Sequence, residues 1–311
     1  MKKTVIAIVG PTAVGKTKLS IEIAKRFNGE IISGDSMQIY KGMNIGTAKI
    51  TTDEMQGIPH HMIDIKNADE TFSAADFQYY VRKYVDEITA RQKLPIIVGG
   101  SGLYIQAALY DYNFSVQKKD DSVTKKLEEI VEAEGITPLY SRLKDIDPVQ
   151  AEKIHPNNHR RVIRALEIYE TTGLTMSKYQ EKQDFRPVYN SLILGLEMDR
   201  ELLYDRINKR IDSMLDDGLL DEVKQMYQAG YGNKQSMKAI GYKEFIPYLD
   251  GEQSIENSIE ILKRNSRRYA KRQYTWFRNK MDITWYTITP DSMNERFGII
   301  LEDLAGFLEN T

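Results

Sequence analysis

Eight residues near the amino terminus constrain this chain more than any other segment: GPTAVGKT at residues 10–17. They follow the apolar run TVIAIV at residues 4–9 and lead into a helical pattern that places Leu19, Ile23 and Ala24 on one side. A strand, a glycine loop and a helix start are the setting that the G-x-x-x-x-G-K-[ST] motif requires. The glycines let backbone N–H groups curl towards a phosphate, and the helix N-terminus adds partial positive charge. The pattern therefore predicts a site for a di- or triphosphate.

Every residue of this loop is a candidate diphosphate contact: Gly10, Pro11, Thr12, Ala13, Val14, Gly15, Lys16 and Thr17. Lys16 can reach the terminal phosphate, and the Thr17 hydroxyl can ligate Mg²⁺, which makes Mg²⁺ the expected cofactor. A glycine turn that binds nothing is the structural alternative, but it does not account for Lys16 followed by Thr17.

The rest of the first hundred residues alternates strand and helix signals. Strands are predicted at residues 30–33 and 94–98, and Phe77, Val81 and Ile88 share one side of a predicted helix at residues 72–88. Such alternation predicts an α/β fold, with a P-loop NTPase-like parallel sheet flanked by helices. Ligands of such sheets bind beyond the carboxyl ends of the strands.

The pattern changes in the middle of the chain. Residues 116–190 are rich in Lys, Glu and Asp and show helical periodicity without a clear strand, whereas a strand signal returns at residues 192–196. Helical patterns then occupy residues 200–217, 219–228, 254–280 and 295–308. We therefore predict a core formed by residues 1–115 and 191–311, interrupted by an all-helical insertion domain at residues 116–190.

Composition excludes several classes of protein. The chain has no cysteine, which rules out disulfides and thiolate zinc sites. Charged residues make up 28% and give a net charge of −2, which argues against nucleic-acid binding over the whole surface but not over a local patch. No apolar run approaches the roughly 20 residues that span a bilayer. We expect a cytoplasmic protein without membrane contact, acting as a monomer.

The usual partner of a phosphate loop in ATP- and GTP-splitting enzymes is a second strand that ends in Asp and supports Mg²⁺. The strand predicted at residues 94–98 instead runs into GGSGLY at residues 99–104, which contains no carboxylate. The strand at residues 30–33 leads to Asp35, a carboxylate beyond the end of a different strand. The sequence thus has the phosphate-binding element without the rest of a hydrolase.

Seven further motifs follow in order. They are GDSMQIY with GTAK (residues 34–40 and 46–49), PHHMID (59–64), GGSGLY (99–104), NHRRVIRALE (158–167), RIDSML continuing to residue 223 (210–223), IGYKE (240–244) and RRYAKRQYTWF (267–277). In this order and spacing they resemble the bacterial tRNA dimethylallyltransferases, also called isopentenyl-diphosphate:tRNA isopentenyltransferases, over nearly the whole chain. That family transfers a dimethylallyl group from dimethylallyl diphosphate to N6 of the adenosine at position 37 of tRNA, beside the anticodon.

The resemblance implies catalytic roles for Asp35, Lys16 and Thr17. Lys16 and Thr17, with Arg210 as a further ligand, would hold the diphosphate, and neutralising its charge eases cleavage of the allylic C–O bond. Asp35 would take the proton from the N6 amine. From the residues alone, Asp35 could instead cap a helix or support Mg²⁺, and Arg210 could lie on a solvated helix face.

The resemblance also implies contacts to the flipped base and its neighbours in the anticodon loop, from Asp35, Ser36, Met37, Gln38 and Ser101. An amide such as that of Gln38 can pair with an adenine edge. Ser101 could equally cap the helix that follows it.

A basic stretch predicts where RNA would lie. Residues 263–280 hold eight basic side chains and no acidic one, with Arg264, Arg268 and Arg272 on one helical face. A solvated face is the ordinary explanation, but a polyanion would relieve the repulsion along this helix. We expect Arg268 and Arg272 to bind tRNA, together with a second cluster at the insertion formed by Arg160, Arg161 and Arg164.

The pair His60 and His61, followed by Asp64, suggests a metal site at first sight. Adjacent side chains on an extended chain point to opposite faces, so they chelate poorly. A structural or loop-positioning role is therefore favoured.

Two other functions share the phosphate loop. A small-molecule or nucleotide kinase would bind ATP tightly and close arginines over the triphosphate, and the arginines at residues 160 and 161 could be read that way. A nucleotide-dependent binding switch would bind partners without a covalent product. The formation of a prenylated adenosine separates both from the prenyltransferase.

Overall fold

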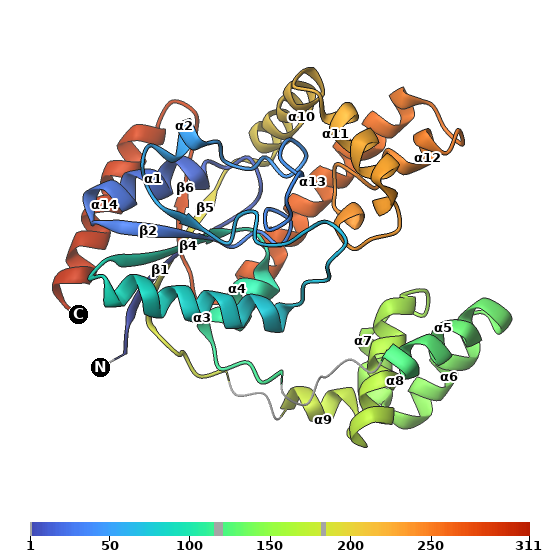
Figure 1. Cartoon of the computed structure of the whole chain (residues 1–311). Coiled ribbons are helices and arrows are strands. Elements are labelled where there is room, and N and C mark those ends of the chain that lie inside the picture. Colours follow the sequence, from blue (N-terminus) through green and yellow to red (C-terminus); the bar gives the residue numbers. More distant parts are fainter. Residues whose placement is uncertain (1, 115–120, 182–184) are drawn as a thin grey trace. The chain divides into compact units, whose positions relative to one another are not determined.

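Six parallel strands form one sheet in the order β3-β2-β4-β1-β5-β6. The computed structural model describes residues 2–114, 121–181 and 185–311. The strand bounds are β1 (Thr4–Val9), β2 (Gly29–Ser33), β3 (His60–His61), β4 (Leu94–Gly99), β5 (Asn190–Glu197) and β6 (Thr284–Thr287). The predicted α/β fold with a parallel sheet is confirmed (Figure 1).

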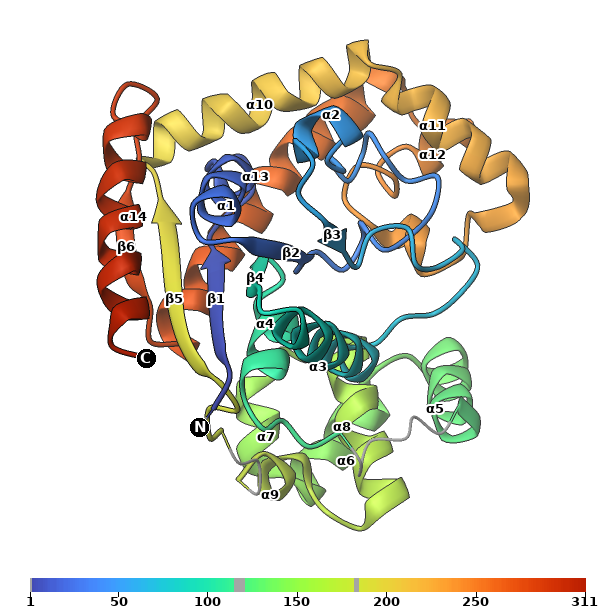
Figure 2. The same cartoon turned by 60° about the vertical axis from the view of Figure 1, so that its left-hand side comes forward.

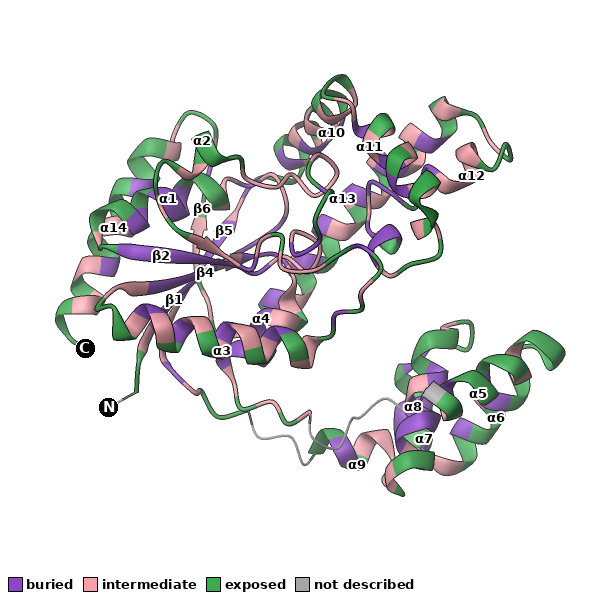
Figure 3. Ribbon diagram, in the orientation of Figure 1, coloured by how far each residue is buried: buried purple, intermediate pink, exposed green. Residues whose placement is uncertain are grey.

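The central strands are apolar because both of their faces are covered. All of β2 and residues 5–9 of β1 are buried, and the same continuous burial extends into β4 (Figure 3). A parallel sheet with helices on both faces requires this pattern. β3 and β6 escape sequence prediction, since one has two residues and the other, TWYT, is exposed at both ends.

Helices cover both faces of the sheet. Figure 1 shows α3 (Ala74–Ala90) and α4 (Gly102–Leu109) on one face, and α1 (Lys16–Arg26) and α14 (Met293–Glu309) on the other. Beyond the strand ends run α10 (Arg200–Asp216), α11 (Leu219–Met226) and α13 (Ile255–Lys280), the last packing against α4 and α10 (Figure 2). Of the helices in the described residues, none is both long and apolar enough to cross a membrane. This part of the chain also contains two short α-helices, α2 (Thr52–Met55) and α12 (Ile246–Leu249), a π-helix (Tyr227–Tyr231) and a 3-10 helix (Ser236–Lys238).

Contacts within the chain divide it into two units, residues 1–109 with 187–311, and residues 110–186. The described part of the second unit is helical, with α5 (Asp121–Glu134), α6 (Thr137–Ile146), α7 (Pro148–Lys153), α8 (His159–Thr172) and α9 (Met176–Glu181). Its apolar core gathers Leu127 from α5, Leu139 and Leu143 from α6, and Val162 and Leu166 from α8. Each of these side chains is at most 2% exposed, so the unit has a core of its own.

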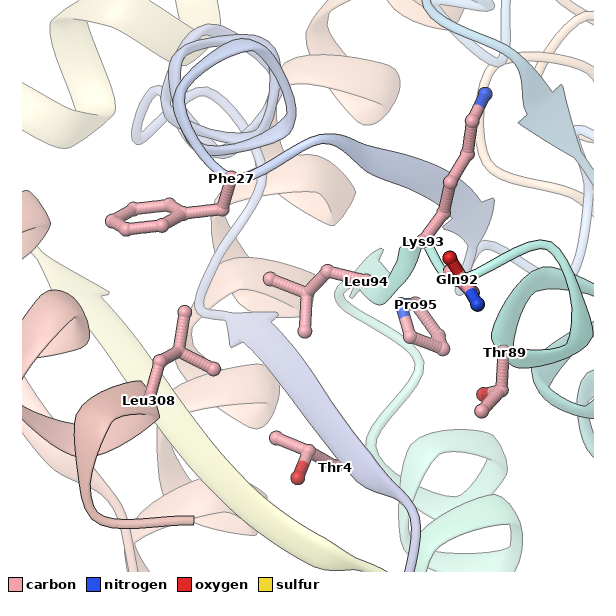
Figure 4. Close-up of a pocket in the computed structure, with 8 residues that line it drawn as sticks. All are labelled: Thr4, Phe27, Thr89, Gln92, Lys93, Leu94, Pro95 and Leu308. Atoms are coloured by element: carbon pink, nitrogen blue, oxygen red, sulfur yellow. The ribbon is translucent and has the colours of Figure 1, made fainter.

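One cavity of about 380 Å³ lies at the amino end of the sheet, where β1 and β4 begin (Figure 4). Phe27, Leu94 and Leu308 line it from three different elements. The predicted site residues do not line it, and ligands of parallel sheets bind at the opposite edge.

A buried carboxylate stands at this same amino end. Glu30 is 2% exposed, and its oxygens accept from Arg91 Nη2 at 2.6 Å and lie 2.7 Å from His61 Nε2 and 3.0 Å from Lys93 Nζ. Burial alone would raise the pKa of Glu30, but the hydrogen bonds from Arg91, His61 and Lys93 outweigh it and lower the pKa to about 2. His61 thus has a structural role.

The Glu30 cluster predicts acid sensitivity. A carboxyl whose pKa falls from 4.5 to about 2 on folding adds stability above pH 4.5, and this is lost as the pH falls towards 2. This contribution of Glu30 to the free energy of unfolding is about 3 kcal/mol at neutral pH. We expect urea unfolding of Glu30→Gln to show lower stability at pH 7 and a weaker further loss at pH 3 than the wild type. The control is Glu87→Gln, from an exposed i,i+4 pair with Lys83, which should follow the wild type. Equal acid sensitivity in Glu30→Gln would contradict the assignment.

Candidate functional site at the carboxyl edge of the sheet

The loop between β1 and α1 has the backbone curvature that a phosphate cradle needs. Gly10 and Gly15 have φ of 139° and 107°, values that side chains rarely allow, and a Cβ on Gly10 would lie 2.4 Å from the Leu196 carbonyl oxygen. Gly15 is the N-cap of α1, and no described side chain accepts a hydrogen bond from the N–H groups of that first turn. These groups and the helix dipole together favour an anion.

Lys16 lies at the start of α1 with its ammonium group turned onto the same loop. Its Nζ donates to the carbonyls of Gly10 at 3.0 Å and Pro11 at 2.6 Å. Burial, and then the charge of Arg210, lower the pKa of Lys16 to about 7, while Asp35 opposes the shift. Thr17, the next residue, is exposed. The loop therefore presents a cation whose charge changes near neutral pH.

Two arginines of α10 extend this positive region. Ala13, Arg206, Lys209 and Arg210 line a cavity of about 310 Å³, and Arg206 Nε donates to the Ala13 carbonyl at 3.0 Å. Arg210 is half-buried, and burial lowers its pKa while the charge of Asp35 raises it. The structure thus brings the predicted diphosphate ligand Arg210 to the phosphate loop.

Asp35 reaches the site because two strand ends touch. Gly34 N donates to the Val98 carbonyl at 2.7 Å, and a Cβ on Gly99 would lie 2.3 Å from the Gly34 oxygen. Asp35 follows directly, and its Oδ1 accepts from Met37 N at 2.8 Å. Burial raises the pKa of Asp35, against the Met37 hydrogen bond and the charges of Lys16 and Arg210. A carboxylate with a raised pKa is a stronger base.

Ser101 stands beside this turn, as the sequence predicts. Its Oγ accepts from Ser36 N at 3.4 Å and lies 3.5 Å from Ser36 Oγ. Tyr269 of α13 lies near Ser101, and burial and the charge of Asp35 raise the pKa of Tyr269 to about 12. Asp35, Ser36 and Ser101 therefore form one polar group.

Gln38 is anchored within the protein. Its Oε1 accepts from Ser33 Oγ at 2.8 Å, and its Nε2 donates to the carbonyls of Thr47 at 3.2 Å and Ala48 at 3.3 Å. The neighbouring Met37 is half-buried. Gln38 thus connects the turn after β2 to the loop that contains Thr47.

Glu222 of α11 holds that loop, a role that the sequence does not reveal. Its carboxylate accepts from three successive N–H groups, those of Asn44 at 2.8 Å, Ile45 at 2.9 Å and Gly46 at 3.0 Å. The Tyr242 hydroxyl also donates to it, at 2.5 Å. Residues of three sequence motifs, around positions 46, 222 and 242, therefore contact one another and hold the loop that binds Gln38. The sequence showed the order of these motifs but not their contacts.

The basic stretch of α13 divides into paired and unpaired side chains. Lys263 pairs with Asp212 at 2.6 Å and Arg278 pairs with Glu197, so acidic residues of other elements compensate these two charges. Arg267 donates to the neutral amide of Asn208 at 2.7 Å. Within the described chain, no acidic partner lies at ion-pair distance from the exposed arginines of the predicted face, which are Arg264, Arg268 and Arg272. These three form the arginine face of α13.

The second basic cluster belongs to the unit of residues 110–186. Arg160 and Arg161 are exposed at the start of α8, whereas Arg164 is half-buried and pairs with the 3% exposed Glu167 at 2.8 Å. Part of the charge of this cluster is therefore used within its own helix.

The histidine motif has structural partners. His60 Nδ1 lies 2.8 Å from the Ile58 carbonyl, and Asp64 accepts from Lys49 Nζ at 2.6 Å. Lys49 is 5% exposed and also donates to the Tyr40 carbonyl and Asn44 Oδ1. Among the described residues no cluster of three His, Asp or Glu could hold a metal ion. The motif fixes the loop that follows Tyr40.

Comparisons with known proteins identify the family of this chain. The sequence model described as IPP transferase matches residues 38–280. The chain belongs to the IPP transferase family. It is 62% identical to the tRNA dimethylallyltransferase of Oceanobacillus iheyensis over 99% of both chains, and 59% identical to that of Bacillus pumilus over 98% of both.

Solved structures of the same family share the fold. The tRNA isopentenylpyrophosphate transferase of Bacillus halodurans superposes with a TM-score of 0.75 at 50% identity, covering 100% of this chain and 98% of that one. A eukaryotic dimethylallyltransferase, described as acting on tRNA, gives a TM-score of 0.80 at 36% identity over 93% of this chain and 75% of that one. The match to this family extends across both units of the chain.

The lowered pKa of Lys16 predicts pH-dependent binding of inorganic pyrophosphate. A diphosphate favours the charged amine, whose free pKa is about 7, so binding above that pH must take up a proton. We expect the affinity of the wild type, relative to Lys16→Arg, to fall up to about tenfold per pH unit above 7, because arginine stays charged. Pyrophosphate itself titrates in this range, but this affects both proteins equally and so cancels in the ratio of their affinities.

Calorimetry in buffers of different ionisation enthalpy measures the proton uptake directly. We expect uptake by the wild type at pH 8 beyond that of Lys16→Arg. An affinity ratio that stays constant from pH 7 to 9, with equal proton uptake, would show that Lys16 is already fully charged in the free protein.

Proposed function

We propose that this protein transfers a dimethylallyl group from dimethylallyl diphosphate to N6 of the adenosine at position 37 of tRNA, in the anticodon loop, and releases diphosphate. The observation that carries the proposal is the placement of Asp35 at the same strand edge as Lys16 and Arg210, close enough for their charges to act on each other. One side of this arrangement suits a departing anion, and the other suits removal of a proton. The relatives named above support the same chemistry.

The transfer breaks one bond and forms one. The N6 nitrogen attacks C1 of the allyl group, the C1–O bond breaks, and the diphosphate leaves with the electron pair. Lys16, Arg210 and the N–H groups of the phosphate loop stabilise the charge that develops on the leaving oxygens. Asp35 accepts the proton that N6 loses, and burial, which raises its pKa, strengthens it as a base.

Mg²⁺ is the proposed cofactor, with Thr17 as its protein ligand. The chemistry of the site fits, because Mg²⁺ keeps several waters and commonly binds through few protein ligands and the oxygens of a phosphate substrate. The exposed Thr17 hydroxyl at the start of α1 can supply such a ligand. When bound, Mg²⁺ would neutralise part of the diphosphate charge. Lys16 and Arg210 supply the rest.

The adenosine must leave the loop stack to reach Asp35. Flipping a base costs a few kcal/mol, less where it is not paired. The arginine face of α13 offers exposed cations for phosphates of the RNA, and such contacts position an RNA without reading its sequence. Ser36, Met37, Gln38 and Ser101 surround Asp35 and are the proposed contacts to the base, with Arg160, Arg161 and Arg164 as further tRNA contacts.

A kinase, the competing function, has less support. An enzyme that transfers a phosphoryl group commonly holds Mg²⁺ with a carboxylate at the end of a second strand. Here β4, the strand at that place, continues into Gly100 and Ser101. The family match and the tRNA enzymes among the relatives also favour prenyl transfer. Because tRNA is the proposed substrate, we also propose that the protein acts in the cytoplasm. A monomer is the proposed form.

Product analysis tests the function. The protein is incubated with dimethylallyl diphosphate, Mg²⁺ and unmodified tRNA, and the nucleosides are then separated. We expect isopentenyl adenosine and an equal amount of released diphosphate.

Asp35→Asn, similar in size but unable to accept the proton, should lower kcat about 100-fold or more while changing the Kd for tRNA less than threefold. Consumption of ATP without a modified base would instead indicate a kinase, and a near-normal rate in the variant would remove Asp35 as the base.

The arginine face predicts a salt effect. The double variant Arg268→Gln, Arg272→Gln should weaken tRNA binding and reduce the slope of log K against log salt by about one unit per arginine. The matched control replaces two exposed arginines on other helices, Arg26→Gln with Arg296→Gln, and changes the net charge equally. Filter binding from 50 to 200 mM salt measures both. Equal slopes in the two double variants would place the RNA elsewhere.

A further inference from the structure

Gln273 of α13 joins the two loops that end β1 and β4. Its Oε1 accepts from Thr12 N at 3.0 Å, in the middle of the phosphate loop. Its Nε2 donates to the Gly100 carbonyl at 3.0 Å, immediately before Ser101. The side chain is only 5% exposed, so both hydrogen bonds are shielded from water. One amide thus fixes the distance between the loop for the diphosphate and the loop beside Asp35.

The Gln273 amide is closely packed against the backbone of the loop that follows β4. A Cβ on Gly100 would lie 2.0 Å from Gln273 Nε2, so a glycine is needed opposite it. One turn earlier, Tyr269 lies close enough to Ser101 and Gln273 for both side chains to affect its pKa. Three residues later, Trp276 packs against Gly102, where a Cβ would lie 2.1 Å from the indole. The inner face of α13 therefore forms a wall of the site.

The opposite side of the same helical turns carries the arginine face. At 100° per residue, Gln273 lies on the far side of the helix from Arg264 and Arg268. Arg272 bridges the two sides, because its guanidinium lies over the ring of Tyr269, 5.6 Å from the centroid. The exposed cation lies over the ring, the ring lies near the amide one turn later, and the amide binds the phosphate loop.

We propose that Gln273 is a positioning residue that sets the curl of the phosphate loop from α13, so that RNA held on the arginine face strengthens the grip on the diphosphate. This inference rests on the proposed function. An amide suits the position because it supplies one acceptor for Thr12 and one donor for Gly100 without adding charge. Losing it would leave a buried N–H and a buried carbonyl unpaired, which forces the loop to rearrange.

The test compares two glutamine-to-methionine variants. Gln273→Met keeps the length and apolar volume of the side chain but removes both hydrogen bonds. The control is Gln106→Met on α4: Gln106 is 8% exposed and donates to the carbonyl of Lys280 at the far end of the same α13. Binding of inorganic pyrophosphate is measured by calorimetry, with and without an unmodified anticodon stem-loop RNA. Thermal unfolding and the KM for each substrate are measured in parallel.

We expect RNA to raise the pyrophosphate affinity of the wild type and of Gln106→Met about fivefold or more. Gln273→Met should bind pyrophosphate about fivefold to twentyfold more weakly and lose most of the RNA effect. Its KM for dimethylallyl diphosphate should rise while its Kd for RNA stays within twofold. A purely structural role would lower the melting temperature and both affinities together, and would leave the RNA effect intact.

The outcomes separate this inference from the proposed function. A wild type that binds neither pyrophosphate nor RNA would contradict the function itself. A wild type that binds both, with Gln273→Met showing the same pyrophosphate affinity or the same RNA effect, would overturn only the role of Gln273.

Discussion

Two glycines, Gly34 and Gly99, let the ends of neighbouring strands approach until their backbones touch. A Cβ on Gly99 would lie 2.3 Å from the Gly34 oxygen, so a larger residue would push β2 and β4 apart. This contact places the turn that starts at Asp35 directly beside Ser101. In the strand order β2-β4-β1, the phosphate loop follows β1, the next strand after β4. A parallel sheet collects its ligands at this edge. The site exists because the ends of β2 and β4 touch at this edge and the loop after β1 lies beside them.

The charge cluster at the amino end of the sheet and the one at its carboxyl edge differ in a way that separates structure from function. At the amino end, Glu30 is surrounded by donors that lower its pKa to about 2, so its charge is fully compensated. At the carboxyl edge, burial lowers the pKa of Lys16 and Arg210 and raises that of Asp35, so burial there outweighs the attraction between these opposite charges. Groups held with shifted pKa values in this way mark functional sites. A diphosphate would supply the negative charge that this edge needs.

Local patterns in the sequence were enough to predict the main strands, the phosphate loop and the exposed arginines of α13. The glycine loop, the apolar runs and the helical spacing each depend on residues close together in the chain. β3 could not be predicted because two residues carry no period, and its place in the sheet comes from pairing with Ile31 and Ile32. The compensation of Lys263 and Arg278 was missed for a related reason, since their acidic partners lie 51 and 81 residues away.

The partners that shape the site are equally distant in sequence. Glu222 binds N–H groups of residues 44–46, and Gln273 binds that of Thr12, 261 residues earlier. Neither contact follows from propensity or periodicity, because both depend on how α11 and α13 fold back over the strand ends. The resemblance to a family could order these motifs along the chain but could not pair them. Only the three-dimensional structure explains why each motif needs the others.

The same contacts limit what Gln38 can do. A bidentate pairing with adenine requires a free amide N–H beside a free carbonyl oxygen. Gln38 Nε2 already faces the carbonyls of Thr47 and Ala48, and its Oε1 accepts from Ser33. One lone pair on Oε1 remains, so Gln38 in this arrangement can accept a hydrogen bond from a base but cannot donate one. Glu222 stabilises the loop that holds Gln38, which makes this arrangement rigid. In the proposed complex, the donor and acceptor pattern of the base is therefore left mainly to Asp35 and the backbone around it.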